Sequence, residues 1–304
     1  MLIYSALLAT AAAGCNAVSS VVQRKANRSR EAQRRSGLRL IAYLVQRPLW
    51  LLGVCTMIVS FLLQAFALGI GTLSAVEPIL AIELPLTLVF AAWTFHRPLR
   101  LRDWLSATVM AAGLAAFVIG LAPSGGHPDH VSTAVVIRAA LGTAACIAGL
   151  CLIARVGPDR ARAAILGVAA GSCFGLTASL LKMAVARFTS SGVSGLLTAW
   201  QTYALAGCGL TAVMLVQSAL HVGTLVAVQP GLTLLDPFVS VLWGTLVLRE
   251  TIRHGPVQLI AVVGVLAVVV AVFALAHASK AAAIHRPRRQ SGGTVIRSAM
   301  HSRQ

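Results

Sequence analysis

The segment that decides the fold is Gly71-Thr72-Leu73-Ser74-Ala75-Val76-Glu77-Pro78, which returns as Gly223-Thr224-Leu225-Val226-Ala227-Val228-Gln229-Pro230. The two copies are offset by 152 positions, and the register holds without a gap through Pro85/Pro237 and Arg97/Arg249. Both copies are apolar, and both lead through a basic turn into another apolar segment. Two such halves, with proline-interrupted helices in matching places, are typical of membrane carriers built from internal repeats.

The composition indicates a membrane protein. The chain is 58% hydrophobic and only 11% charged, with a mean hydropathy of +0.84, whereas a soluble domain carries roughly 25% charged residues. Most of its apolar runs have about 20 residues, the length that crosses a hydrocarbon core of about 30 Å. We therefore predict an all-α fold, a polytopic bundle of membrane helices.

Nine apolar segments are long enough to be spans, at about 2–22, 49–68, 72–95, 104–122, 134–154, 163–186, 196–217, 223–248 and 257–277. Twenty of the 25 Lys and Arg residues fall on one side if the basic segment 23–48 is cytoplasmic. The positive-inside rule then places the N-terminus outside the plasma (inner) membrane and the basic tail 279–304, which we expect to be disordered, inside.

The spans group into two predicted repeats. Spans 1–4 form the first within residues 1–122, and spans 6–9 form the second within residues 163–278. Residues 123–162 hold an outer loop and span 5, which connects the repeats. Equivalent spans are five apart, an odd number, so the second repeat is predicted to be inverted. Inverted halves provide the two mirror conformations that alternating access needs.

Several function classes are excluded by what the sequence contains. The net charge of +17 would suit nucleic acid, but the basic residues lie in connecting segments and the tail. The six cysteines fall inside apolar segments and have no metal-binding spacing. No glycine-rich phosphate loop with its lysine is present, and no nucleophile lies beside a base. We therefore expect no enzyme activity, no bound cofactor and no nucleic-acid partner.

Three of the eight acidic residues lie within predicted spans, namely Glu77, Glu83 and Asp236. A charged side chain at the bilayer centre costs at least about 2.5 kcal/mol, so such residues mark functional sites by default. Glu83 aligns with the neighbour of Asp236 in the repeat register, which predicts a shared cation or proton site near the midplane. The nearby Pro85 and Pro237 free backbone carbonyls that suit a hard cation.

Other polar residues inside the spans could line a transport pathway. These residues are Gln229, Lys182, Asn16, Gln64 and Gln201, and Glu77 joins Glu83 and Asp236 in the same set. An alternative is purely structural, because a buried carboxylate can be protonated or can pair with Lys182 between packed helices. Lys182 fits such pairing better than contact with a substrate.

The motifs resemble the EamA-type drug/metabolite transporter superfamily. Val76-Glu77-Pro78 matches its Glu-Pro signature, and Leu248-Arg249-Glu250 resembles its Gly-Glu turn with Arg in place of Gly. The first copy departs at this turn, with Phe95-His96-Arg97-Pro98. Members commonly have ten spans; nine spans and a basic Gln23-Arg24-Lys25 exit resemble the NIPA-like magnesium transporter branch.

The resemblance implies a secondary transporter that moves a small solute or cation across the bilayer by alternating access. The NIPA-like branch implies Mg²⁺ as cargo, with Glu83 and Asp236 as its two carboxylate ligands, and proton coupling is the other option. A membrane scaffold or partner subunit that does not transport is the alternative from a different class. A homodimer is also compatible with the sequence.

Overall fold

The structure, a computed structural model, describes residues 2–27, 46–96, 101–126, 131–156, 158–223, 225–253 and 255–284. The basic segment 28–45, the turn at 97–100, the loop residues 127–130 and tail residues 285–304 lie outside the described residues.

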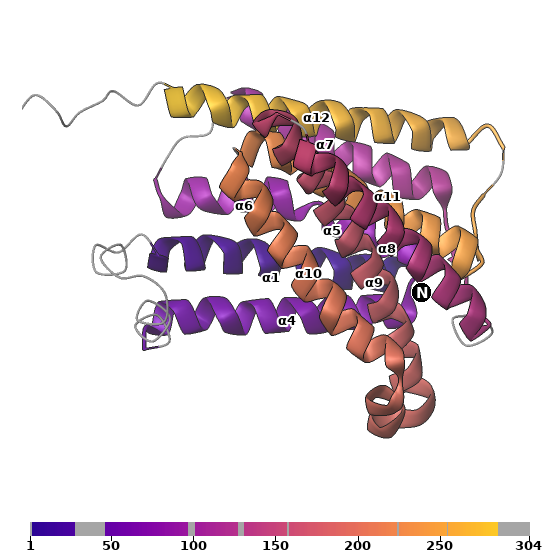
Figure 1. Ribbon diagram of the computed structural model, residues 1–304. Helices are drawn as coiled ribbons and strands as arrows, with labels where there is room; N and C mark the ends of the chain where they lie inside the picture. Colours follow the sequence, from indigo (N-terminus) through magenta and orange to yellow (C-terminus); the bar gives the residue numbers. More distant parts are fainter. Residues whose placement is uncertain are drawn as a thin grey trace, which may run out of the picture.

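The chain is almost entirely helical (Figure 1). Its elements are α1 (Leu2–Asn27), α4 (Pro48–Ile70), α5 (Leu73–Leu80), α6 (Glu83–Thr94), α7 (Leu101–Leu121), β1 (Ser124–Gly125), α8 (Thr133–Val156), α9 (Asp159–Thr198), α10 (Trp200–Val222), α11 (Leu225–Leu242), the π-helix η2 (Trp243–Val247), β2 (Glu250–Thr251) and α12 (Gln258–Ile284). Within the described ranges, eight helical segments are long and apolar enough to cross a membrane, with α5–α6 and α11–η2 each counted as one segment. The predicted all-α membrane bundle is confirmed.

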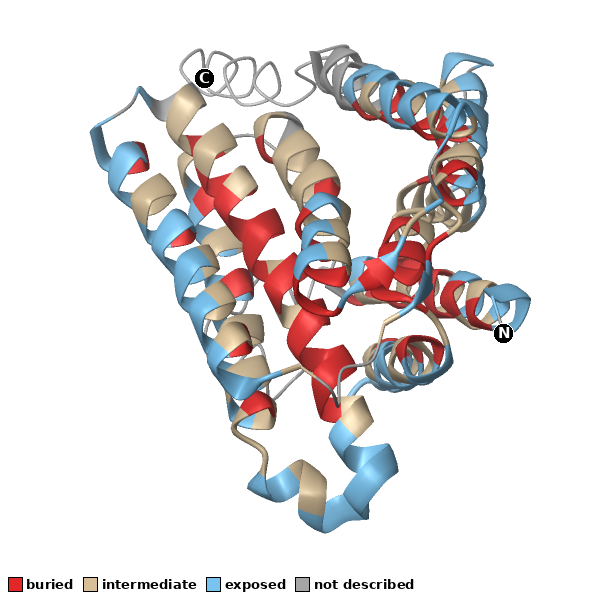
Figure 2. Ribbon diagram, turned by 90° about the vertical axis from the view of Figure 1, so that its right-hand side faces the viewer, coloured by how far each residue is buried: buried red, intermediate tan, exposed pale blue. Residues whose placement is uncertain are grey.

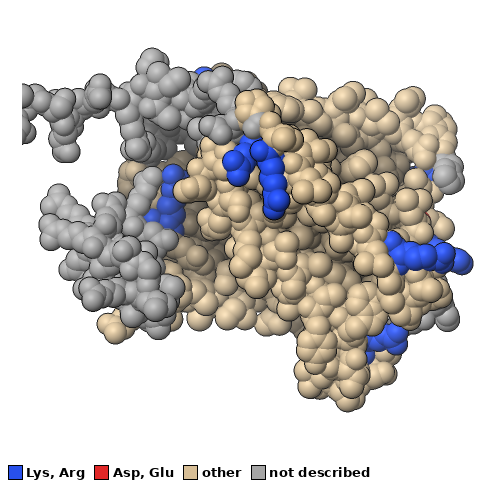
Figure 3. All heavy atoms as spheres, viewed as in Figure 1, with Lys and Arg blue, Asp and Glu red and all other residues tan. Residues whose placement is uncertain are grey.

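The surface of the bundle is apolar, as expected for helices that face lipid. Large side chains such as Leu141, Leu210 and Leu259 are exposed, while buried residues gather along the interior (Figure 2). On the face drawn in Figure 3, no Asp or Glu is visible, and the few Lys and Arg are separated by wide uncharged stretches. Such a surface suits hydrocarbon and would be a liability in water.

Neighbouring helices pack in a regular order. In the first half α1 lies against α4, in the second α9 lies against α10 and α11, and α7 of one half lies along α12 of the other (Figure 1). The ends of α4 and α10 are alike. Gly71 N donates to Ala67 O at 2.8 Å, and Gly223 N donates to Ala219 O at 3.0 Å. These two caps lie 152 positions apart, the repeat offset of the sequence.

The sequence predicted that prolines interrupt a helix at matching places in both halves, and this prediction is wrong for the second half. The first half is interrupted at residues 81–82, between α5 and α6, whereas α11 continues through both Pro230 and Pro237. Pro85 falls in the first turn of α6, where its missing N–H leaves no hydrogen bond unmade. In α11 the two prolines are inside the helix, in the stretch that packs closely on α9.

Three further helix ends differ from the predicted ones. Helix α9 continues through the predicted outer connection at 187–195, and only Gly192 leaves helical geometry, at φ 65°. Hydroxyl groups there bond to preceding carbonyls, with Thr198 Oγ1 donating to Ser194 O at 2.8 Å. Hydroxyl bonds of this kind compete with the helical backbone and often bend a helix, in keeping with the kink at Gly192. Helix α1 continues past residue 22 to Asn27, and α12 reaches Ile284, inside the predicted tail.

Close packing of α9 on α11 depends on three glycines in one helical row, Gly167, Gly171 and Gly175. A Cβ on each would lie 2.6–2.7 Å from a backbone carbonyl oxygen of α11. Small residues four apart let two helix backbones approach, the usual device for helix association in a bilayer. The row therefore sets the distance between α9 and the helix that carries Asp236.

We expect Gly171→Ala to destabilise the protein and Gly142→Ala not to. Alanine gains about 1 kcal/mol of helix propensity at either position. At Gly171 the new methyl group would lie 2.7 Å from Leu232 O, whereas at Gly142 nothing lies within 4 Å. Overpacking of this kind costs about 1–3 kcal/mol. Thermal unfolding in detergent should show a lower Tm for Gly171→Ala alone; equal shifts would contradict the packing argument.

Candidate functional site

Two carboxylates flank the interruption between α5 and α6, and each is held by an amide from another helix. Glu77 on α5 is buried, and its Oε1 accepts a hydrogen bond from Gln64 Nε2 of α4 at 3.0 Å. Glu83 begins α6 and is half-buried, and its Oε2 accepts from Asn16 Nδ2 of α1 at 2.7 Å. Four of the predicted pathway residues therefore form two bonded pairs in the first half.

Asp236 on α11 of the second half lies within electrostatic range of this pair. The charges of Glu77 and Glu83 both act on it, and its Oδ1 is buried without a hydrogen-bond partner. The three carboxylates that the sequence singled out are therefore near enough to interact electrostatically, and we name Glu77, Glu83 and Asp236 the carboxylate group. Like charges repel strongly in a low-dielectric interior, and a bound cation or proton removes that repulsion.

The remaining predicted residues are placed differently. Gln229 Nε2 donates to Thr233 Oγ1 on α11 at 3.4 Å, and Gln201 is buried in the first turn of α10. Among the described residues, no group of three or more His, Cys, Asp or Glu side chains converges as a metal site. Glu83 and Asp236 would therefore supply two ligands at most, and a metal there would keep several waters.

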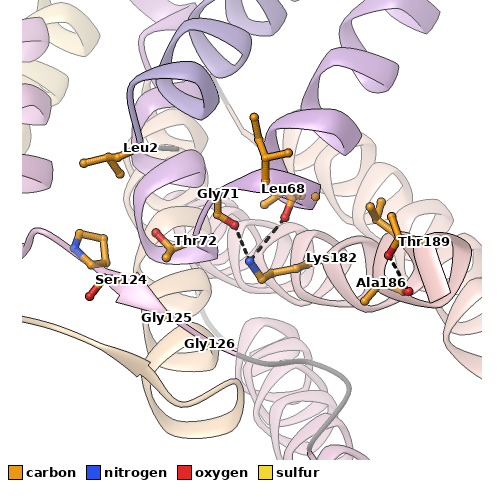
Figure 4. Close-up of a pocket in the computed structure, with 14 residues that line it drawn as sticks. Leu2, Leu68, Gly71, Thr72, Ser124, Gly125, Gly126, Lys182, Ala186 and Thr189 are labelled. Carbon is orange, nitrogen blue, oxygen red and sulfur yellow. Dashed lines mark hydrogen bonds between the residues drawn. The ribbon is translucent and has the colours of Figure 1, made fainter.

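Lys182 of α9 is buried and binds the end of α4 (Figure 4). Its Nζ donates to Gly71 O at 2.6 Å and to Leu68 O at 3.5 Å. It also lies 3.5 Å from Glu250 Oε1, with side-chain exposures of 6% and 0% for the two residues. The sequence suggested that Lys182 pairs with a carboxylate inside the spans. In the structure, Lys182 forms its ion pair with Glu250 instead.

Glu250 joins the two halves at the start of α5. Its Oε1 accepts from Leu73 N at 2.6 Å and its Oε2 from Ser74 N at 2.9 Å, the first two amides of that helix. A carboxylate here satisfies amides without helical partners and complements the positive end of the helix dipole. Gly126 and Gly244 line the carboxylate closely, because a Cβ on either would come within 3 Å of Glu250.

The sequence interpretation missed this role of Glu250. The residue stood in a predicted outer turn, and its one signal was the resemblance of Leu248-Arg249-Glu250 to a Gly-Glu turn. The structure explains that pattern, since Arg249 has φ 56°, a left-handed conformation that favours glycine. The turn directs the following side chain inward to α5.

A pocket of about 330 Å³ opens beside Lys182 (Figure 4), and we name it the Lys182 pocket. It is lined by residues from four parts of the chain, Leu2, residues 68–72, residues 123–126, and Lys182 with Val185, Ala186 and Thr189. The carboxylate group lies outside its lining.

The fold and the site can be compared with known proteins. The chain is 30% identical over 233 residues to an uncharacterized protein of Corynebacterium glutamicum, covering 76% of this chain and 80% of that protein. The chain belongs to the family of this corynebacterial protein. No protein-family model matches the chain, and no solved structure matches it. Its activity is therefore argued from the site.

Proposed function

We propose that the chain is a secondary carrier that moves a small solute or cation across the plasma membrane by alternating access, in the manner of the drug/metabolite transporters. The observation that carries the proposal is the carboxylate group: α5 of the first half, which holds buried Glu77, packs on α11 of the second, which holds the unpartnered Asp236. A scaffold gains nothing from the cost of inserting three acidic residues. A carrier needs such a site where its halves meet.

The internal geometry supports an inverted repeat of nine spans. The glycine caps of α4 and α10 are equivalent, and each glycine packs against the start of a neighbouring helix, Gly71 on Ser5 and Gly223 on Ala163. Helix α12 provides the ninth span, with an apolar stretch over Gln258–Ala274. Two equivalent hairpins that start from opposite sides of the bilayer are what an inverted repeat requires.

The segments that meet support the proposed orientation of the chain. Leu2, residues 68–72 and residues 123–126 line one pocket, and Ser124 pairs with Thr251 in the β1–β2 ladder. All of these segments are on the predicted outer side. We therefore place the Lys182 pocket at the outer surface, with the N-terminus outside and the C-terminus in the cytoplasm.

Reporter fusions test this orientation. A fusion after Ser124 and a fusion at the C-terminus are expected to report opposite sides of the membrane, with the C-terminus cytoplasmic. A periplasmic alkaline phosphatase and a cytoplasmic fluorescent protein distinguish the two sides. The same side for both fusions would contradict nine spans, and with them the inverted repeat.

The carrier proposal is tested by flux into proteoliposomes. Purified protein is reconstituted, a pH gradient or membrane potential is imposed, and uptake of Mg²⁺ and of a panel of labelled organic solutes is compared with empty vesicles. Saturable uptake of one solute supports the proposal. Uptake of Mg²⁺ that other divalent ions inhibit competitively would favour the magnesium branch. No flux of any solute under any gradient would favour a scaffold.

A further inference from the structure

Buried polar atoms without partners occur on two helices that pack together, at the start of α5 and along α11. Among the described residues, five buried side-chain polar atoms have no hydrogen-bond partner, and four belong to Thr72, Ser74, Ser240 and Asp236. Native proteins leave few such atoms, and each calls for a reason, internal water among them. Four on two packed helices call for a shared reason.

The polar residues on α11 follow one face of the helix. Thr233, Asp236, Ser240 and Gly244 are spaced by three or four residues, so they lie on the same side of the helix. Thr233 and Ser240 are buried, and Gln229, one turn before Thr233, donates to its hydroxyl. A polar stripe therefore runs along a membrane helix, although its other faces are apolar.

At its outer end the stripe meets α5 and Glu250. A Cβ on Gly244 would come within 3 Å of both Ser74 Oγ and the Glu250 carboxylate. Ser74 N donates to that carboxylate, which lies 3.5 Å from Lys182 Nζ in the pocket wall. We name this set the polar column: Thr72 and Lys182 at the pocket, then Glu250, Ser74 and Ser240, ending at Asp236.

We propose that the polar column is the route by which protons from the outer pocket reach the carboxylate group, so that the carrier is coupled to protons. This inference rests on the proposed carrier function. A proton passes between hydroxyl groups and bridging waters and forms an O–H bond on a carboxylate oxygen of Asp236. It leaves to the opposite side when the carrier changes conformation, so no other reactant is needed.

The charges around the column favour a proton over a metal ion. Asp236 faces Glu77 from α5 and Glu83 from α6, while Lys182 of α9 is engaged by Glu250. Helix α12 has no charged side chain between residues 258 and 274. The glycine walls are tight, and the described residues contain no cluster of three metal-ligating side chains. A proton can pass between hydroxyl and carboxylate groups without the ligand shell that a metal ion requires.

Time-resolved infrared spectroscopy of proteoliposomes tests the route. With N-termini outward and the interior strongly buffered, the outer medium is acidified rapidly, and the carboxylic C=O band of protonated Asp236 is followed. Asp236→Asn is expected to lack this band. Ser240→Ala should reach the wild-type amplitude about tenfold more slowly, which corresponds to ~1.4 kcal/mol in the barrier.

The matched control is Ser218→Ala, because Ser218 is exposed on α10 and its hydroxyl bonds to Met214 O of the same helix. It should behave as wild type. Ser74→Ala is the second variant, in case Ser240→Ala fails to fold. A wild-type rate in the folded Ser240→Ala or Ser74→Ala protein, or an unchanged band in Asp236→Asn, overturns the proposal. Solute flux is measured on the same vesicles: protonation through the column without any flux would count against the carrier and leave the column in place.

Discussion

Replacing Glu250 by alanine is expected to produce the largest loss of stability of any single substitution in the chain. The change leaves Lys182 buried without its anion and removes the acceptor for Leu73 N and Ser74 N. Breaking a buried ion pair by removing one partner costs about 3–5 kcal/mol. Thermal unfolding in detergent, followed by size-exclusion chromatography, should show a sharply lower Tm.

A double-mutant cycle separates the pair from its surroundings. Lys182→Met fills similar volume without charge, so combining it with Glu250→Gln should recover part of the stability that Lys182→Met alone loses. The pair of exposed Arg102 and partly buried Asp103 on α7, 3.9 Å apart, provides the control, because removing the exposed Arg102 as Arg102→Ala should change Tm little. Additive losses at Lys182 and Glu250 would show that the two charges do not act on each other.

Neutralising the carboxylate group is expected to abolish transport without unfolding the protein. Glu83→Gln keeps the volume of the side chain and a partner for Asn16 Nδ2, and Asp236→Asn likewise changes only charge. Either should lower flux on the order of 100-fold, equivalent to ~2.7 kcal/mol. The measurement is initial uptake of whichever solute the proteoliposome screen identifies, normalised to reconstituted protein.

The matched control for this prediction is Asp103→Asn, which neutralises a carboxylate in the first turn of α7, on another helix. It should retain wild-type flux. If Glu83→Gln and Asp236→Asn both transport normally, the carboxylate group is not the site. An organic solute bound by Gln64, Gln201 and aromatic residues then becomes the better hypothesis. Loss of flux together with a lower Tm would instead point to a structural role.

The class of protein was predictable from the sequence, and the acidic residues inside its spans were conspicuous there. Hydropathy is a local property, so runs of apolar residues long enough to cross a bilayer can be read directly. An acidic residue inside such a run is conspicuous, which is why Glu77, Glu83 and Asp236 were found. The repeat register placed Glu83 almost opposite Asp236, and in the structure the charge of Glu83 acts on Asp236.

The contacts that join the halves were decided only by the tertiary structure. Glu250 and Leu73 are 177 positions apart, and neither hydropathy nor spacing connects an acidic residue in a turn to the start of a distant helix. The continuity of α11 through Pro230 and Pro237, beside the glycine row of α9, likewise depends on packing at backbone distance. Sequence periodicity defines which face of a helix is polar, whereas the partner of that face depends on how the helices pack in three dimensions. The sequence alone therefore indicated a membrane bundle with acidic residues inside its helices. Packing determined that Glu250 would bind the first amides of α5 and pair with Lys182 of α9.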